Sequence, residues 1–289
     1  MDQLLLSIIS GVSNGAVYGL VGLGLVIIYR STDVMNFAAG TMALGCMYLA
    51  SGLHGAGVPL ALAVVAGITV CSLLGVGARE VLIRPLGPGA LFSALVVTMG
   101  LSLILEEATR GIWGGEPRDF PALVGGNATI GGATFTNQQL LVIPVAAVAM
   151  LAVAYLFKKT PLGSAMRAVA ESSGTATLLG IRPQRVARIA WALGMGLAAL
   201  GAAMLVPTAG LSIGGFTGVL FRAFAGIFLG GLTSMYGAVI GGVVVGVLDN
   251  VAANYVSASL RDTFVFSLVI LVLLARPQGL FGEKTFARV

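Results

Sequence analysis

The chain has 289 residues, of which 57% are hydrophobic and 9% charged, with a net charge of +5 and a mean hydropathy of +1.01. A soluble domain carries about 25% charged residues, so this composition excludes a soluble globular fold. The 42 glycines lie largely inside apolar runs, as is typical of closely packed membrane helices. The predicted fold class is therefore all-α, a polytopic membrane helix bundle.

A hydrocarbon core about 30 Å thick requires roughly 20 apolar residues per helix, and this length divides the sequence into spans. We expect about eight or nine transmembrane helices in a single membrane domain that covers residues 1–289. In chain order, the predicted spans are 4–29, 37–52, 59–78, 91–109, 138–157, 189–211, 219–231, 235–255 and 262–275. The spans 37–52 and 219–231 are short, so each is predicted either to cross the bilayer or to be a re-entrant or broken helix.

Positive residues predict the orientation of these helices. Twelve of the 16 Lys and Arg residues fall on one side of the predicted spans, and the positive-inside rule assigns that side to the cytoplasm. The amino terminus is then outside and the carboxyl terminus inside. The first 29 residues lack the basic start of a signal peptide and have a longer apolar run, so we expect them to be retained.

Two connecting segments are long enough to have roles of their own. Residues 110–137 form a predicted external loop, in which the β-prone stretch 128–135 predicts a short hairpin. Residues 158–188 form a predicted cytoplasmic loop with six basic residues and one acid. The centre of this second loop predicts short amphipathic helices that end at Gly180. Such helices are suited to a cleft in a partner protein.

Four segments carry a resemblance to a known family. They are Asn36-Phe-Ala-Ala-Gly40, the 163–180 loop with its core Arg167-Ala-Val-Ala-Glu171, the run FRAFAGIFLGGLTSMYGA at 221–238, and the ending Arg276-Pro-Gln-Gly-Leu-Phe-Gly282. In this order, and over nearly the full length, the chain is similar to the branched-chain amino acid permeases of bacterial ABC importers. It departs from the family pattern at Arg222, where Lys is frequent, and at Ser172-Ser173.

The resemblance implies a permease subunit that moves branched-chain amino acids or similar small solutes across the bacterial inner membrane by alternating access. The implied partners are a second homologous permease subunit, two cytosolic P-loop ATPase subunits and an external solute-binding protein. ATP and Mg²⁺ are then bound by the ATPases, and no cofactor is expected in this chain. The residues implied to couple the helices to an ATPase are Gly163, Arg167, Ala168, Glu171 and Gly180. Urea or short-chain amides are the alternative solutes, because permeases of similar pattern carry them.

The chain lacks the motifs that other function classes need. No G-x-x-x-x-G-K-[ST] motif occurs, so energy must come from another chain or from an ion gradient, and a self-sufficient secondary transporter or channel is an alternative. An intramembrane enzyme would need a Ser/His/Asp set or a metal cluster, but His54 is the single histidine. We therefore expect no catalytic or metal-binding residues. Basic residues flank the spans, which indicates a lipid bilayer as the partner and no nucleic acid.

Polar residues inside the spans are candidates for a solute pathway, because a polar group is costly in hydrocarbon unless it faces protein or water. The predicted pathway residues are Asn14, Tyr18, Asn36, Thr41, Thr98, Ser102 and Asp249. The alternative is that they bridge neighbouring helices, and Asp249 is predicted to be functional or paired with Arg222 or Arg261. Glu106 and Glu107, at the outer end of a span, predict a solvated vestibule or a binding-protein contact.

Glycines four residues apart predict where helices approach most closely. This spacing places small residues on one helix face, so that a neighbouring backbone can come into contact. The predicted packing residues are Gly15, Gly19, Gly230, Gly237 and Gly241.

Overall fold

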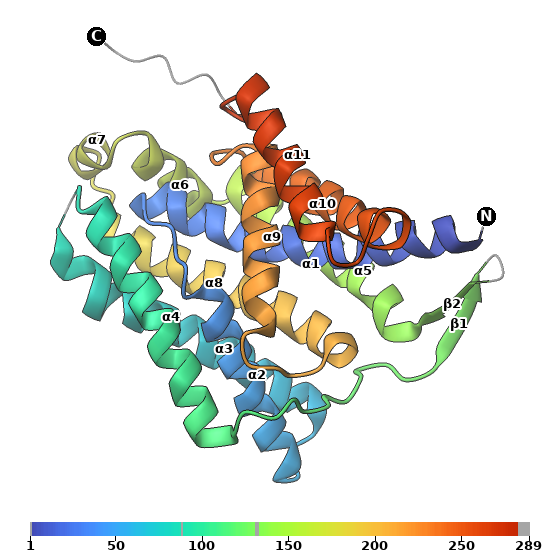
Figure 1. Ribbon diagram of the computed structural model, residues 1–289. Helices are drawn as coiled ribbons and strands as arrows, with labels where there is room; N and C mark the ends of the chain where they lie inside the picture. Colours follow the sequence, from blue (N-terminus) through green and yellow to red (C-terminus); the bar gives the residue numbers. More distant parts are fainter. Residues whose placement is uncertain (1, 88, 131–132, 283–289) are drawn as a thin grey trace.

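The computed structural model describes residues 2–87, 89–130 and 133–282. Most of this part of the chain is helical, and each of the nine predicted spans coincides with a helix (Figure 1). The elements are α1 (Asp2–Thr32), α2 (Ala39–Gly55), α3 (Leu60–Ala78), η1 (Arg79–Ile83), η2 (Arg84–Leu86), α4 (Leu91–Trp113), β1 (Asn127–Ile130), β2 (Ala133–Thr136), α5 (Asn137–Lys159), α6 (Pro161–Glu171), α7 (Ser173–Leu178), α8 (Pro183–Ala209), α9 (Gly215–Gly230), α10 (Met235–Tyr255) and α11 (Arg261–Ala275).

Six helical segments within the described residues are long and apolar enough to cross a membrane. They are Leu6–Thr32, Leu60–Leu86, Leu91–Trp113, Asn137–Lys159, Pro183–Ala209 and Met235–Tyr255. The helices α2, α9 and α11 are shorter, with 17, 16 and 15 residues. The two spans predicted to be short, α2 and α9, are therefore short helices. Helix α11 is also short.

Several helices continue past the spans that the sequence predicts, because polar residues also suit a helix outside the hydrocarbon. Helix α4 extends to Trp113, so the segment between α4 and β1 begins later than residue 110. Helix α8 begins at Pro183, which stands in the first turn where proline is tolerated, six residues before the predicted span. The segment between α5 and α8 is therefore shorter than the predicted loop 158–188 and holds α6 and α7.

The centre of the bundle is a contact between α1 and α10, in which glycines bring two backbones together. A Cβ atom placed on Gly15 would lie 2.7 Å from Val243 Cα, and one on Gly246 would lie 2.3 Å from Gly15 Cα. A Cβ on Gly19 would lie 2.8 Å from the Met150 side chain and 3.3 Å from the Val239 carbonyl oxygen. Any larger side chain at these glycines would push the helices apart.

A second glycine contact joins α9 to α10. A Cβ on Gly230 would lie 1.9 Å from the carbonyl oxygen of Gly237, and one on Gly241 would lie 2.0 Å from that of Gly226. The chain reverses between the two helices at Gly231, whose φ of +111° is one that residues with a side chain rarely adopt. The predicted packing glycines thus lie at two contacts of α10: Gly15 and Gly19 are on the α1 side of the first, and Gly230, Gly237 and Gly241 form the second, between α9 and α10.

The carboxyl-terminal segment closes the end of α9. The last carbonyls of a helix have no partner within it. Here the backbone N–H of Leu280 donates to the carbonyl of Leu229 at 2.8 Å, and the N–H of Phe281 donates to that of Gly230 at 2.9 Å. The motif at residues 276–282 is therefore held against the glycine-rich run 221–238, far away in sequence.

The hairpin predicted at residues 128–135 is confirmed. Strands β1 and β2 are antiparallel, with Asn127 opposite Thr136 and Ala128 opposite Phe135, and they project from the bundle beside the start of α5 (Figure 1). Thr136 also begins α5 through a capping box, in which its side chain accepts from Gln139 N and its own N–H donates to the Gln139 side chain.

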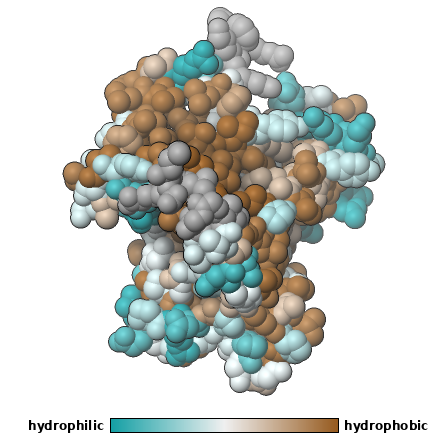
Figure 2. Space-filling model, turned by 90° about the vertical axis from the view of Figure 1, so that its right-hand side faces the viewer, coloured by the Kyte–Doolittle hydropathy of each residue, from teal (hydrophilic) through white to brown (hydrophobic). Residues whose placement is uncertain are grey.

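Apolar side chains cover a broad area of the outer surface (Figure 2). On this face, hydrophilic residues gather toward one end and one side. On α3, α4 and α5, large side chains such as Leu73, Leu103 and Leu151 are at least 65% exposed. A patch of this size on a soluble monomer would be unusual, whereas it is expected where a protein faces lipid.

Candidate functional site

A strip of polar side chains runs along one face of α4. Thr98, Ser102 and Glu106 are spaced by four residues, which places them above one another on a helix. The Thr98 hydroxyl donates to the carbonyl of Leu95 at 3.0 Å and to that of Met35 at 3.3 Å. Ser102 Oγ lies 2.6 Å from Thr41 Oγ1 of α2, so the strip faces the start of that helix.

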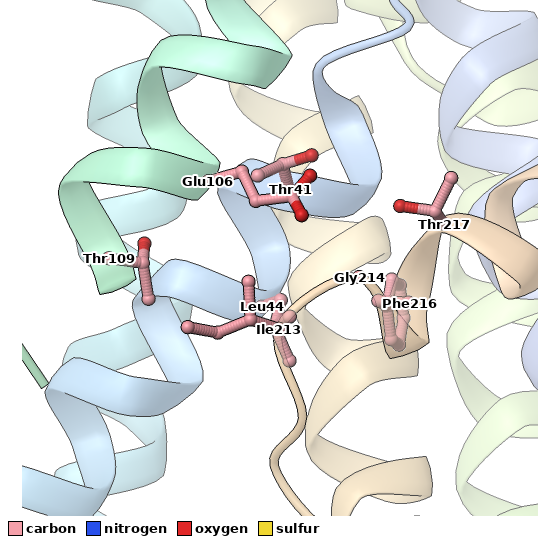
Figure 3. A pocket seen from close by; sticks show the side chains of 8 residues that line it. All are labelled: Thr41, Leu44, Glu106, Thr109, Ile213, Gly214, Phe216 and Thr217. Atoms are coloured by element: carbon pink, nitrogen blue, oxygen red, sulfur yellow. The ribbon is translucent and has the colours of Figure 1, made fainter. Parts of the chain in front are cut away.

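The strip leads into a small pocket between α4, α2 and the start of α9 (Figure 3). Its lining residues are Thr41, Leu44, Glu106, Thr109, Ile213, Gly214, Phe216 and Thr217. Glu106 and Thr41 point into it from α4 and α2, and Thr217 faces it from α9 (Figure 3). The volume of about 10 Å³ is room for about one water molecule, so the pocket is too small for an amino acid in this conformation.

Only one of the two neighbouring acids, for which the sequence predicts the same role, lines the pocket. The Glu106 side chain is 26% exposed and lines the pocket, whereas that of Glu107 is 71% exposed. Both lie near Arg110, at 3.7 Å from Glu106 Oε1 and 3.4 Å from Glu107 Oε1. Sequence reasoning missed Thr109, Gly214 and Thr217 as lining residues, and the Gly214-Gly215 break before α9 was the signal available.

Asn36 has a local role just before α2. Its side-chain oxygen accepts from Ala38 N at 3.0 Å, and its Nδ2 donates to Met195 Sδ of α8 at 3.3 Å. The side chain is 1% exposed and is not among the residues that line the α4 pocket. The arrangement holds the turn between α1 and α2 against α8.

An ion cluster, buried at Arg222 and Asp249 and exposed at Arg261 and Asp262, joins α1, α9, α10 and α11. Arg222 Nε of α9 lies 3.0 Å from Asp249 Oδ1 of α10, and Nη2 of the same side chain donates to Asp262 of α11. Arg261 Nε lies 3.8 Å from Asp249 Oδ1, and the Tyr18 hydroxyl donates to Asp249 Oδ2 at 3.5 Å. The predicted pairing of Asp249 with Arg222 or Arg261 is confirmed, because both arginines lie within ion-pair distance.

This cluster is distinct from the α4 strip. None of its members lines the pocket at Glu106. Asn14, half-buried on α1, lies one helical turn before Tyr18. The seven predicted pathway residues therefore fall into the α4 strip with Thr41, the turn at Asn36, and the region of α1 and α10 around Asp249.

Helix α6 is fastened to the end of α5 by its own residues. Thr160 Oγ1 accepts from Gly163 N at 3.2 Å, which caps the helix. A Cβ on Gly163 would lie 2.3 Å from the Leu156 carbonyl oxygen, so only glycine fits there. Arg167 donates to the carbonyl of Phe157 and, at 3.1 Å, to Ser164 Oγ. Glu171 stands four residues after Arg167 on the same helix and could have paired with it. The Arg167 side chain instead turns back to the end of α5.

Helix α7 ends in apolar side chains that are exposed on the surface of the chain. Ser172, one of the two serines that depart from the family pattern, caps α7 by accepting from Thr175 N at 3.2 Å. Leu178 and Leu179 are 88% and 73% exposed, and Gly180 follows with φ +81°. Glu171 is also exposed, while Ala168 is partly buried.

The described residues contain no group of three or more His, Cys, Asp or Glu side chains that could hold a metal ion. The polar groups that the structure places together are hydroxyls, one carboxylate facing a pocket, and a neutralised ion cluster. These groups can bind and guide a polar solute.

The long apolar helices, the exposed apolar surface and the few polar groups between helices define a multi-pass membrane protein with an apolar core. Residues 7–274 match the model of the family described as "Branched-chain amino acid transport system / permease component". The chain belongs to this family, and it is a multi-pass permease of a bacterial inner membrane.

Curated relatives extend over nearly the full chain. The chain is 29% identical to the high-affinity branched-chain amino acid transport system permease protein BraD of Pseudomonas aeruginosa, over 98% of this chain and 97% of the relative. It is also 29% identical to the corresponding protein LivH of Escherichia coli K12, over 97% and 96%. Among solved structures, PsaBC from Streptococcus pneumoniae in complex with Fab is similar in fold, with a TM-score of 0.52, 12% identity, and coverage of 96% and 93%.

Proposed function

We propose that this chain is one permease subunit of an ATP-driven importer that moves branched-chain amino acids across the membrane by alternating access. The observation that carries the proposal is the α6–α7 unit, which is fastened to α5 and ends in exposed leucines. A family of transport permeases and full-length relatives named for branched-chain amino acids support it. In this proposal the amino terminus is outside, and α6, α7 and the carboxyl terminus are inside.

The α6–α7 unit can pass a push from an ATPase to the transmembrane helices. Gly163 lets α6 lie directly on the backbone of α5, and Arg167 ties the two helices together. A force on α7 would then move α5 instead of being absorbed by a slack loop. Leu178 and Leu179 have the exposure expected of anchors that fill a partner's cleft. Two cytosolic ATPases are the proposed partners, and they hold the ATP and Mg²⁺.

The α4 strip is the proposed solute path. Only 11% of the apolar window of α4 is buried in the chain, so a second homologous permease subunit can cover this helix. Because Thr41 and Ser102 share one hydrogen bond, one of their two hydroxyl hydrogens remains as a donor for a carboxylate, and Glu106 provides an acceptor for an ammonium group. The pocket beside Glu106 is too small for the solute in this conformation, so in alternating access it would have to widen in another state of the cycle. An external binding protein is proposed to deliver the solute.

Urea and short-chain amides are the second candidate class of solute, since they also use hydroxyl donors and acceptors. They lack the ammonium group from which Glu106 would accept a hydrogen bond. Uptake of labelled leucine and of labelled urea, measured in parallel, therefore separates the two.

The test is uptake into liposomes that contain the chain purified with its co-expressed partners. We expect leucine uptake only with ATP and with the ATPases present. The variant Leu178→Asp places a charge on the proposed anchor and should lower uptake roughly tenfold or more, as loss of a central interface side chain does. Val124→Asp, at a 43% exposed apolar residue of the external segment, is the matched control and should transport normally.

Two results would contradict the proposal. Leucine uptake without ATP or ATPases would indicate a secondary transporter. Equal uptake by Leu178→Asp and Val124→Asp, with both proteins folded by size-exclusion chromatography, would show that α7 does not meet the ATPase.

A further inference from the structure

A groove separate from the α4 strip lies between α1, α5, α6 and α10. Its volume of about 420 Å³ is within the range of about 300–1,000 Å³ that small-molecule sites have. The walls along most of its length are apolar, with Met150 and Ala154 from α5, Val239 and Ile240 from α10, and Leu23 from α1. A chain of methylene groups would be in apolar contact on three sides.

One end of the groove is basic. Arg30, Lys158 and Arg167 line it, and among the described residues no acidic side chain lines the groove. None of the three cations takes part in the ion pairs found among the described residues. The Lys158 ammonium lies 5.2 Å from the centre of the Tyr236 ring, a cation–π contact that keeps it at the groove without neutralising it.

The basic end lies where two long apolar helices end. Arg30 is in the last turn of α1 and Lys158 is in the last turn of α5, and both helices are long enough to cross a membrane. Arg167 follows on α6, just beyond the end of α5. Basic residues at the ends of transmembrane helices are where phosphate headgroups are met.

The groove is open toward the outside of the bundle. Leu151, Tyr236 and Ile240 line it and are 69%, 53% and 43% exposed. In a membrane, such side chains are covered by lipid or by another protein. Two copies of this chain joined through the groove would place two sets of unneutralised cations against each other, which is unfavourable.

We propose that this groove binds one anionic phospholipid, with its phosphate between Arg30, Lys158 and Arg167 and an acyl chain along α5 and α10. The phosphate supplies the charge that the groove lacks, and the acyl chain fills the apolar part. Because Arg167 and Lys158 also adjoin the α5–α6 junction, the lipid would lie against the unit that contacts the ATPase.

Native mass spectrometry of the full chain, purified with its partners and stripped of lipid, tests the proposal. Phosphatidylglycerol and phosphatidylcholine of identical acyl chains are added back in turn. We expect one tightly held phosphatidylglycerol per chain and weaker retention of phosphatidylcholine. Arg30→Gln with Lys158→Gln should weaken phosphatidylglycerol binding about 30-fold. Lys159→Gln with Arg185→Gln removes the same charge from exposed residues outside the groove and should leave it unchanged.

A second pair of variants tests the apolar part. Ala154→Trp fills the groove and should abolish the tight site, whereas Ala152→Trp, exposed on the same helix outside the groove, should not. Equal binding of the two lipids by the wild type, or equal binding by the two double variants, would overturn the proposal. A loss of subunit assembly in Ala154→Trp alone would show that a protein occupies the groove and would also overturn it.

Discussion

Helices α1 and α4 are both long and apolar, yet their surroundings differ. In α1, 89% of the most apolar window is buried inside the chain, while in α4 the share is 11%. The face of α1 toward α10 is made of glycines in backbone contact, and the polar face of α4 meets a small pocket. The difference indicates that α1 and α10 hold the subunit together, and that α4 is available to a solute and a second subunit.

The largest effect is expected from breaking the α1–α10 contact. In Gly246→Val, the new Cβ would lie 2.3 Å from Gly15 Cα and 2.5 Å from the Gly11 carbonyl oxygen, so backbone would have to move. We expect a subunit that does not fold, because this clash is with backbone and should cost well above the about 1–3 kcal/mol of overpacking in cores where side chains can adjust. Size-exclusion chromatography in mild detergent measures this.

Gly100→Val on α4 is the matched control. Among the described residues, no atom lies within 4 Å of a Cβ at Gly100, and valine is acceptable in a helix. Expressed without a partner subunit, this variant should elute as the wild-type subunit does. Equal aggregation of the two variants would show that the contrast between α1 and α4 does not govern assembly.

A smaller effect is expected at the ion cluster beside the α1–α10 contact. Asp249→Asn leaves Arg222 and Arg261 without their buried acid and should destabilise the fold by about 3 kcal/mol, measured as thermal unfolding in detergent. Asp262→Asn removes the other partner of the same Arg222. Because its side chain is 59% exposed, water can replace it, and the loss should be clearly smaller.

The double variant Asp249→Leu with Arg222→Met separates structure from transport. Replacing both members of a buried pair by apolar residues is often neutral for stability. If Asp249 only holds helices together, the double variant should unfold near the wild-type temperature and transport leucine. Restored stability without transport would assign the cluster to the solute path instead.

The sequence predicts the helices well because span length and apolar composition are local properties. The four motif segments and the pairing of Asp249 were also accessible from residue type and order. The pocket at Glu106 was not, since it depends on where the break at Gly214 places α9 against α4. The partner of Arg167 could not be predicted either, for a similar reason. Its spacing to Glu171 is a local pattern, whereas the carbonyl of Phe157 becomes available only when α6 folds back on α5.

The smallest effect on stability, and a specific one on transport, is expected at the acids of α4. Glu106→Gln keeps the shape of the side chain and removes the charge that faces Thr41 and Thr217 across the pocket (Figure 3). Since Glu106 is near the surface of the chain, unfolding should shift by less than about 1 kcal/mol. Leucine uptake should fall roughly tenfold, the order expected for loss of a hydrogen bond to a charged group. Glu107→Gln removes the same charge one residue away, at a side chain that points outward, and should transport as the wild type does. A fall in uptake that is equal in the two variants would mean that the acids act together as a charged rim, and that the pocket does not distinguish α4 from the rest of the surface.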